Sequence, residues 1–335
     1  MPIPFILGGL ALAAAGYGVK KGIDAKDDQD TANRLNESAQ EIVDKATKRA
    51  KSSRTKCSNS IQKLGNQKIQ VLNESVIPFI EIFKKINNIE LEESRGLEEL
   101  KKLKIDKNFF VELRQMGDMA SSLAGGIASG TAMGAVTAFG AYGIAGTLGV
   151  ASTGTAIGTL TGAAATNATL AFLGGGAISA GGLGIAGGTA VLGGLVAGPA
   201  LAVLGACAAS KAEANKEKAY ANIAKARRFE EEMNTVATLC NGIGARARLF
   251  DRLLAQLDEI FVSQTNALIT IIQNTGCDYR KYDLQEKQVV AGSLSTLTSI
   301  KAILDTPILS ENGTLTPESQ QIAQATEMFL AEHEA

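Results

Sequence analysis

The sequence predicts an all-α protein: an elongated antiparallel helical bundle or coiled coil with a central glycine-rich hydrophobic helical hairpin. Two observations predict this fold. Residues 119–210 contain no Asp, Glu, Lys or Arg, yet they hold 23 of the 36 glycines of the 335-residue chain. The charged stretches on either side carry apolar residues every three or four positions. Residues at that spacing share one face of a helix, so the two flanks can pack against each other.

Composition excludes several classes of function. The 33 basic and 34 acidic side chains nearly cancel, so we expect no nucleic-acid partner. The only histidine, His333, lies at the C-terminal end, which disfavours catalytic triads and His-ligated metal sites. The cysteines form no Cys-x-x-Cys pair, so we expect neither a zinc site nor a disulfide framework; they are Cys57, Cys207, Cys240 and Cys277. We therefore expect no enzyme activity and no cofactor.

Residues 1–22 are predicted to form a hydrophobic anchor or membrane-contact segment. The first 18 residues are apolar, and Lys20 and Lys21 follow them. Lysines after an apolar stretch suit an anchor whose charged end stays in the cytoplasm. Two alternatives stay open, a signal peptide cleaved near Ala13 and Ala15, and burial of this stretch within the bundle.

Residues 23–118 are predicted to form an N-terminal long-helix region. Apolar residues recur at helical spacing from Ala32 to Phe83, and residues 25–115 carry most of the helix. Pro78 interrupts this pattern. Because proline has no N–H and its ring clashes with the preceding turn, we expect it to kink or end the helix.

Residues 119–210 are predicted to form a glycine-zipper region that inserts into a membrane. A membrane-spanning helix needs roughly 20 apolar residues, so there is room for two to four crossings. Glycines four residues apart make a smooth groove in which another helix can approach closely. We expect helix packing at Gly126, Gly130, Gly134, Gly154, Gly158, Gly162, Gly184, Gly188, Gly194 and Gly198. The sequence from Gly182 to Gly187 also matches G-x-G-x-x-G, but it lacks the preceding strand and the later acid of a dinucleotide site.

Residues 211–275 are predicted to form a heptad coiled-coil helix that stops at Gly276. The expected seam includes Phe229, Met233, Val236, Ile243, Phe250, Leu254, Leu257, Phe261, Leu268 and Ile271. Residues 276–335 should complete the bundle with two helices, one over residues 284–304 and one that starts at Pro317 with Thr316 as its cap.

The order of these parts resembles that of α-helical pore-forming proteins, the cytolysin A and haemolysin BL class, and of apolipoprotein L. In each, long helices flank an uncharged, mildly apolar hairpin. The resemblance covers the layout of most of the chain and rests on no residue-specific motif. It implies a compact form that hides the hairpin and an assembled form that inserts it.

These features predict a protein that inserts into a bilayer, forms a homo-oligomer, and permeabilises or remodels the membrane. We expect it on the cytoplasmic side of a membrane, with conversion from a soluble to a membrane-bound form. One alternative is a membrane-anchored coiled-coil scaffold that recruits a partner enzyme, such as a GTPase, through its coiled coil. Another is a soluble glycine-zipper bundle that keeps its apolar run buried.

Overall fold

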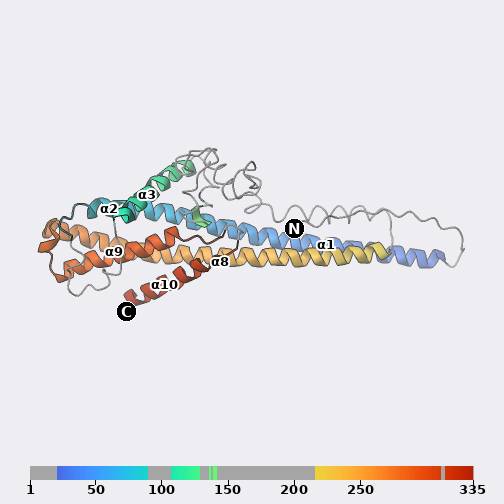
Figure 1. Cartoon of the computed structure of the whole chain (residues 1–335). Coiled ribbons are helices and arrows are strands. Elements are labelled where there is room, and N and C mark those ends of the chain that lie inside the picture. The colour runs from blue at the N-terminus through green and yellow to red at the C-terminus, as the bar shows by residue number, and fades with distance from the viewer. Residues whose placement is uncertain are drawn as a thin grey trace. The chain divides into compact units, whose positions relative to one another are not determined.

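A computed structural model describes residues 21–89, 107–128, 136, 139–141, 216–310 and 314–334. Within these residues the structure consists of helices joined by turns and short loops, with two isolated β-bridges and no strand, so the predicted all-α class is confirmed. The elements are labelled in Figure 1. They are α1 (Lys21–Val71), the π-helix η1 (Leu72–Val76), α2 (Ile77–Phe83), α3 (Lys107–Ala128), α8 (Lys216–Asn274), the 3-10 helix η6 (Tyr279–Lys281), α9 (Leu284–Asp305) and α10 (Pro317–Glu334).

The chain divides into two compact units, Met1–Thr47 with Pro199–Glu232, and Lys48–Gly198 with Met233–Ala335. Helices α1 and α8 contribute to both. In the smaller unit the Asn222 amide donates to the Asn36 side-chain oxygen at 3.0 Å, and both residues are buried. A buried amide that has a partner avoids most of its desolvation cost. The other buried side chains described in this unit are mostly small: Ala32, Ala39, Val43, Ala46, Ala219, Ala226 and Phe229.

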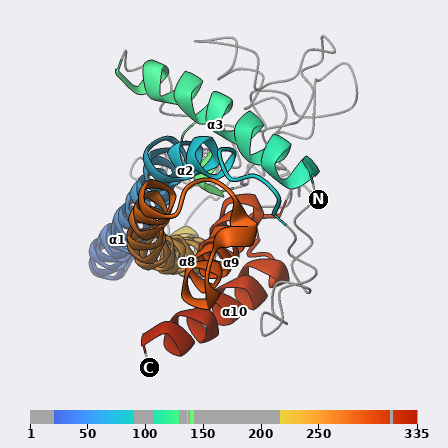
Figure 2. The same ribbon diagram turned by 90° about the vertical axis from the view of Figure 1, so that its left-hand side faces the viewer.

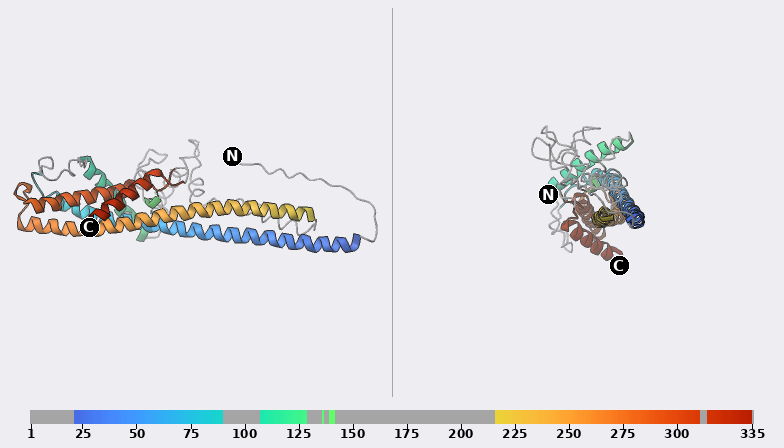
Figure 3. Two further views of the ribbon diagram at one scale, coloured as in Figure 1. Left: turned by 90° about the horizontal axis from the view of Figure 1, so that it is seen from below. Right: turned by 90° about the vertical axis from the view of Figure 1, so that its right-hand side faces the viewer.

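In the larger unit, α1 and α8 lie side by side and run parallel (Figure 3). Their contacts follow one order along both helices: Arg49 with Asn234, Ser60 with Arg248, Lys63 with Asp251, and Phe79 of α2 with Phe261. The Lys63 and Asp251 charges are 2.7 Å apart, and the ring centroids of Phe79 and Phe261 are 4.8 Å apart. Residue numbers therefore rise together on the two helices.

The expectation that the two long flanks pack antiparallel is wrong for this pair. Heptad spacing determines which face of a helix is apolar, but an apolar face can meet its neighbour in either direction. The chain reverses in α3, where the hydroxyl of Ser121 donates to Asn73 at 2.9 Å and Arg114 pairs with Glu81. Helix α3 thus runs antiparallel to η1 and α2, and the reversal precedes α8.

Pro78 lies at the start of α2, directly after the π-helix η1. The backbone N–H of Ile77 donates to the carbonyl of Leu72, five residues back. This wider turn accommodates Pro78, which has no N–H to donate to a helical hydrogen bond and whose ring crowds the preceding turn. The predicted break at Pro78 is therefore a local π-turn, after which the helix continues to Phe83.

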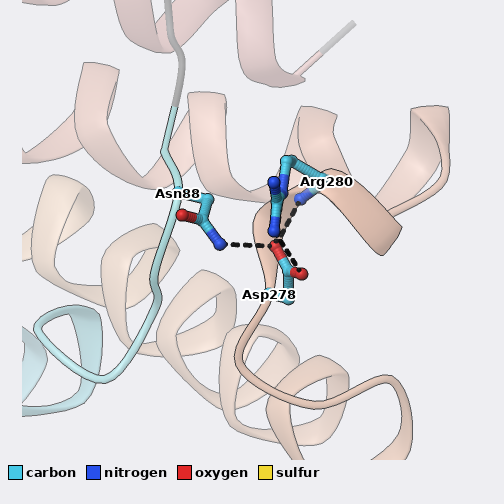
Figure 4. A network of polar contacts seen from close by, with 3 residues as sticks. All are labelled: Asn88, Asp278 and Arg280. Atoms are coloured by element: carbon cyan, nitrogen blue, oxygen red, sulfur yellow. Dashed lines mark hydrogen bonds and ion pairs between the residues drawn. The ribbon is translucent and has the colours of Figure 1, made fainter.

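A polar clamp joins the end of α2 to the end of α8. The N–H of Asn87 donates to the carbonyl of Cys277 at 2.7 Å, and the side chain of Asn88 donates to Asp278 at 3.0 Å (Figure 4). Arg280 also donates to Asp278, and these hydrogen bonds hold the pKa of the Asp278 carboxyl well below its usual range. Gly276 ends α8 with a φ of 94°, which confirms the predicted stop.

Helix α9 returns antiparallel to α8, since the Thr275 hydroxyl donates to Glu286 at 2.5 Å. Asp283 and Glu286 form a capping box at its start. In Figure 2, α3 and α10 lie on opposite sides of α2, α8 and α9. The predicted cap of α10 is confirmed, because the N–H of Ser319 donates to the Thr316 hydroxyl at 3.3 Å.

The core of the larger unit is apolar and drawn from all of its helices. It includes Leu64, Leu72, Phe79, Leu113, Phe250, Leu254, Phe261, Leu297 and Leu304, all fully buried. Among the described residues, no helix has both the length and the apolar character needed to cross a bilayer. Most of the predicted membrane region, residues 119–210, lies outside the described residues.

Candidate functional site

The uncharged run meets the helical bundle along α1. A Cβ atom added to Gly65 would lie 2.2 Å from the carbonyl oxygen of Val136. One added to Gly140 would lie 2.2 Å from the carbonyl oxygen of Ile61. Real Cβ atoms do not approach oxygen this closely, so the two backbones touch only because both positions are glycine. Val136 contacts Gly65, and Gly140 contacts Ile61, so residue numbers rise along the run while they fall along α1. The run therefore continues in the antiparallel direction of α3.

Two further contacts hold this stretch. The carbonyl oxygen of Ala141 accepts hydrogen bonds from the backbone N–H groups of Ile308, at 2.7 Å, and Leu309, at 3.2 Å. The side chains of Val136 and Phe139 are 1% and 0% exposed. The described part of the run is therefore docked on α1 and on the segment between α9 and α10.

A buried lysine lies beneath the docked stretch. Lys68 is 0% exposed, and its ammonium donates to the carbonyl oxygen of Leu304 at 3.3 Å. The same nitrogen is 5.8 Å from the centroid of the Phe139 ring. Burial lowers the pKa of the Lys68 amine from its ordinary value to about 7, although Asp305 attracts the charged form. We call Lys68, Phe139, Leu304 and Asp305 the Lys68 site.

Asp305, the carboxylate that attracts the charged form of Lys68, already has another partner. Lys301 lies 2.5 Å from Asp305 and 2.8 Å from Glu112 of α3. Burial would lower the pKa of Lys301, but its hydrogen bonds to these two carboxylates raise it overall. Burial raises the pKa of Asp305, and the bond from Lys301 only partly opposes this. Among the residues that the structure describes, Lys68 therefore makes no ion pair with a carboxylate that would stabilise its charge.

In this arrangement the docking of Phe139 depends on whether Lys68 is protonated. A neutral Lys68 can remain in the apolar site, whereas a protonated one loses hydration that one carbonyl and one ring do not replace. A buried lysine of lowered pKa can also serve as a nucleophile in enzymes. Lys68 is closed off from solvent in this structure, so what the geometry supports is control of docking.

The structure describes only one of the ten predicted zipper glycines. Gly126 lies in the last turns of α3. The others lie outside the described residues: Gly130, Gly134, Gly154, Gly158, Gly162, Gly184, Gly188, Gly194 and Gly198.

All ten predicted seam residues lie on α8. Eight are buried: Phe229, Met233, Ile243, Phe250, Leu254, Leu257, Phe261 and Leu268. The other two, Val236 and Ile271, are half-buried.

Lys68 is not among the sites predicted from the sequence, because charged residues on long helices usually lie on solvated faces. A signal was present. Lys68 is four residues after Leu64 and four before Leu72, which places it on the apolar face of α1. A charge on an apolar face needs a partner or a lowered pKa.

The structure also brings together two cysteines that the sequence treats as unrelated. Cys57 of α1 and Cys240 of α8 lie close enough for each thiol to shift the pKa of the other. Each lies on the apolar face of its helix, but the sequence does not show which residues of the two helices meet.

In the part of the chain that the structure describes, no three His, Cys, Asp or Glu side chains gather as metal ligands would. Comparison of the chain with protein-family models, curated proteins and solved structures found no match. The resemblance to α-helical pore-forming proteins therefore stays a prediction from the order of the parts.

Proposed function

We propose that the protein inserts its uncharged segment, residues 119–210, into a lipid bilayer, oligomerises there, and permeabilises or remodels the membrane. One observation carries this proposal. The segment has no Asp, Glu, Lys or Arg in 92 residues, whereas one such charge at a helix centre would cost about 2.5 to 3.5 kcal/mol on insertion scales. The whole chain is 20% charged, and all of its charged residues lie outside this segment, so solubility does not explain why the segment lacks them.

The bundle supports the proposal by providing a folded carrier. Its core is built mainly from α1, α2, α3, α8 and α9, and the side chains that the docked stretch adds to it are Val136, Phe139 and Ala141. Release of this stretch would leave contacts such as Phe79 with Phe261 in place. The part of the segment that follows α3 can therefore be released without loss of the parallel α1 and α8 pair.

The Lys68 site supplies a trigger. Between pH 10.5 and about 7, Lys68 holds a proton when water reaches it but not when it is buried in this site. Undocking of Phe139 lets water reach the ammonium. Acid therefore favours the released form, and the neutral amine favours the docked form.

Purified full-length protein, mixed with vesicles of zwitterionic and anionic phospholipid that hold a self-quenching dye, tests the proposal. Flotation reports membrane binding, and dye release reports permeabilisation. Both should occur, and both should increase as the pH falls from about 10 to about 7, the window between the ordinary and the lowered pKa of Lys68. Binding without dye release or a change in vesicle shape would instead favour the scaffold that recruits a partner enzyme. Absence of binding at either pH would overturn the proposal.

The control variant is Lys68→Met, which is unbranched and nearly as long as lysine but takes up no proton. It should bind and release dye at high protein concentration, with a much smaller difference between the two pH values. If the variant loses only the difference between the two pH values, Lys68 controls the release of the segment and is not needed for membrane binding or dye release.

A further inference from the structure

Cys57 and Cys240 face each other across the α1 and α8 pair. Cys57 is 8% exposed and Cys240 is half-buried, and both are free thiols. Gly244, one helical turn after Cys240, lies against Cys57, since a Cβ added there would be in van der Waals contact with the Cα of Cys57 at 3.4 Å. Residues one turn apart share a helix face, so Cys240 lies on the face that meets α1. The two sulfurs are within hydrogen-bonding reach of each other.

The two thiols differ in their surroundings. The hydrogen bond from Cys57 lowers the pKa of Cys240 to about 7, and the charge of Arg54 adds to this, while burial opposes it. The hydrogen bond to Cys240, followed by burial, raises the pKa of the Cys57 thiol well above its ordinary value. A thiolate attacks a disulfide and a thiol does not, so Cys240 is the attacking group and Cys57 the second one.

We propose that Cys57 and Cys240 form a dithiol site that is reversibly oxidised to a disulfide between α1 and α8 by low-molecular-weight disulfides. This inference goes beyond the proposed membrane function and does not depend on it.

The reaction has two steps. The Cys240 thiolate attacks one sulfur of the small disulfide, whose S–S bond breaks and releases one small thiolate. Cys57 then loses its proton to solvent, and its sulfur attacks Cys240, which releases the second small thiolate. The protein loses two electrons and the small disulfide gains them. Modification of Cys240 removes its charge from beside Cys57, so the second thiol ionises more readily, helped by Arg248.

The bond would join residues that are 183 positions apart and would enclose the whole uncharged segment within the loop. Cross-linking a loop of this length restricts the unfolded chain and makes the folded state more resistant to denaturation. The oxidation state would therefore set how readily α1 separates from α8.

The test uses the full chain with Cys207→Ser and Cys277→Ser, so that Cys57 and Cys240 are its only thiols. The folded protein is incubated with oxidised glutathione at neutral pH, quenched with an alkylating agent, and analysed by intact mass and by non-reducing peptide mapping. We expect loss of two hydrogens, a linked peptide pair, a rise in melting temperature, and reversal of all three by dithiothreitol. A folded protein that keeps both thiols, under conditions that oxidise the urea-unfolded chain, would overturn the proposal.

Two single variants in the same background test the roles of the two sulfurs. Cys57→Ser should accumulate glutathione on Cys240, because nothing resolves the mixed disulfide. Cys240→Ser should react several times more slowly at Cys57, since Cys57 is the more buried of the two sulfurs. Equal rates in the two variants would contradict the assigned order of attack.

Discussion

The Lys68 nitrogen lies over the face of the Phe139 ring, 5.8 Å from the ring centroid. This contact joins α1 to the uncharged run, and both side chains are fully buried. An attraction between a cation and a ring contributes about 2 kcal/mol or more when desolvated, which is less than the several kcal/mol that a buried ion costs. The site is therefore most stable when Lys68 is neutral, and its stability depends on pH.

The first prediction is that the folded state gains stability as the pH rises above neutral. The pKa of Lys68 is about 7 in the folded protein against an ordinary 10.5, so between these values only the unfolded chain holds the proton. The free energy of unfolding should then rise by up to about 1.4 kcal/mol per pH unit within that window. Urea unfolding followed by circular dichroism at a series of pH values measures it.

Lys68→Met isolates this contribution, because all other titrating groups are common to the two proteins. The variant should be more stable than the wild type near pH 6, where the wild type bears the full cost of a buried ammonium. Its advantage should shrink as the pH rises toward 10.5. If the two proteins differed by a constant amount at every pH, Lys68 would not titrate in the folded state as described.

The second prediction compares two glycines within helices. A Cβ at Gly65 would lie 2.2 Å from the Val136 carbonyl, whereas one at Gly242 would meet only Leu315 at 3.7 Å. Gly65→Ala should lower the free energy of unfolding by about 1 to 3 kcal/mol, as overpacking does. Gly242→Ala should be neutral or stabilising, by up to about 1 kcal/mol, because alanine favours the helix.

Urea midpoints of the two alanine variants decide this comparison. Limited proteolysis near Val136 gives a second measurement, since Gly65→Ala should expose the docked stretch even if the rest of the bundle relaxes. Equal stability and equal protection in the two variants would show that the run does not dock on α1 at Gly65.

The sequence predicts the helical class and the face of each helix, but it does not predict how the faces pair. The spacing from Phe250 to Phe261 indicates an apolar stripe because burial follows the helical period. The direction of α1 against α8 depends on the path of the connecting chain, which α3 reverses through pairs such as Ser121 with Asn73. No periodicity carries that information.

The Lys68 and cysteine sites were hidden for the same reason. Lys68 stands between Leu64 and Leu72 on an apolar face, so its burial could be suspected from spacing alone. Its neighbours Phe139 and Asp305 come from distant parts of the chain, and only the fold brings them together. Cys57 meets Cys240 because the two helices run parallel in one register, and an antiparallel pairing would have separated them.

The third prediction is that Leu254 contributes to the core of the bundle. Leu254 is 0% exposed, and Val262, two turns later on α8, is 42% exposed. Leu254→Ala should cost about 2 to 5 kcal/mol, while Val262→Ala should stay within about 0.5 kcal/mol of the wild type. Thermal and urea unfolding of the two variants measure the difference. Similar losses in both would mean that burial along α8 does not follow the heptad seam.

The last prediction concerns the glycine zipper, which rests on sequence spacing because Gly130 and Gly158 lie outside the described residues. If these glycines lie at close helix crossings in the bilayer, leucine would separate the two backbones and remove the packing that drives association. Gly130→Leu and Gly158→Leu should then bind vesicles as the wild type does but lose cross-linked oligomers and dye release. Ala132→Leu and Ala156→Leu add the same side chain two positions away, close to the opposite helix face, and should keep both activities. If the glycine variants form as much oligomer as the wild type, the four-residue spacing of the glycines reflects low sequence complexity and not helix packing.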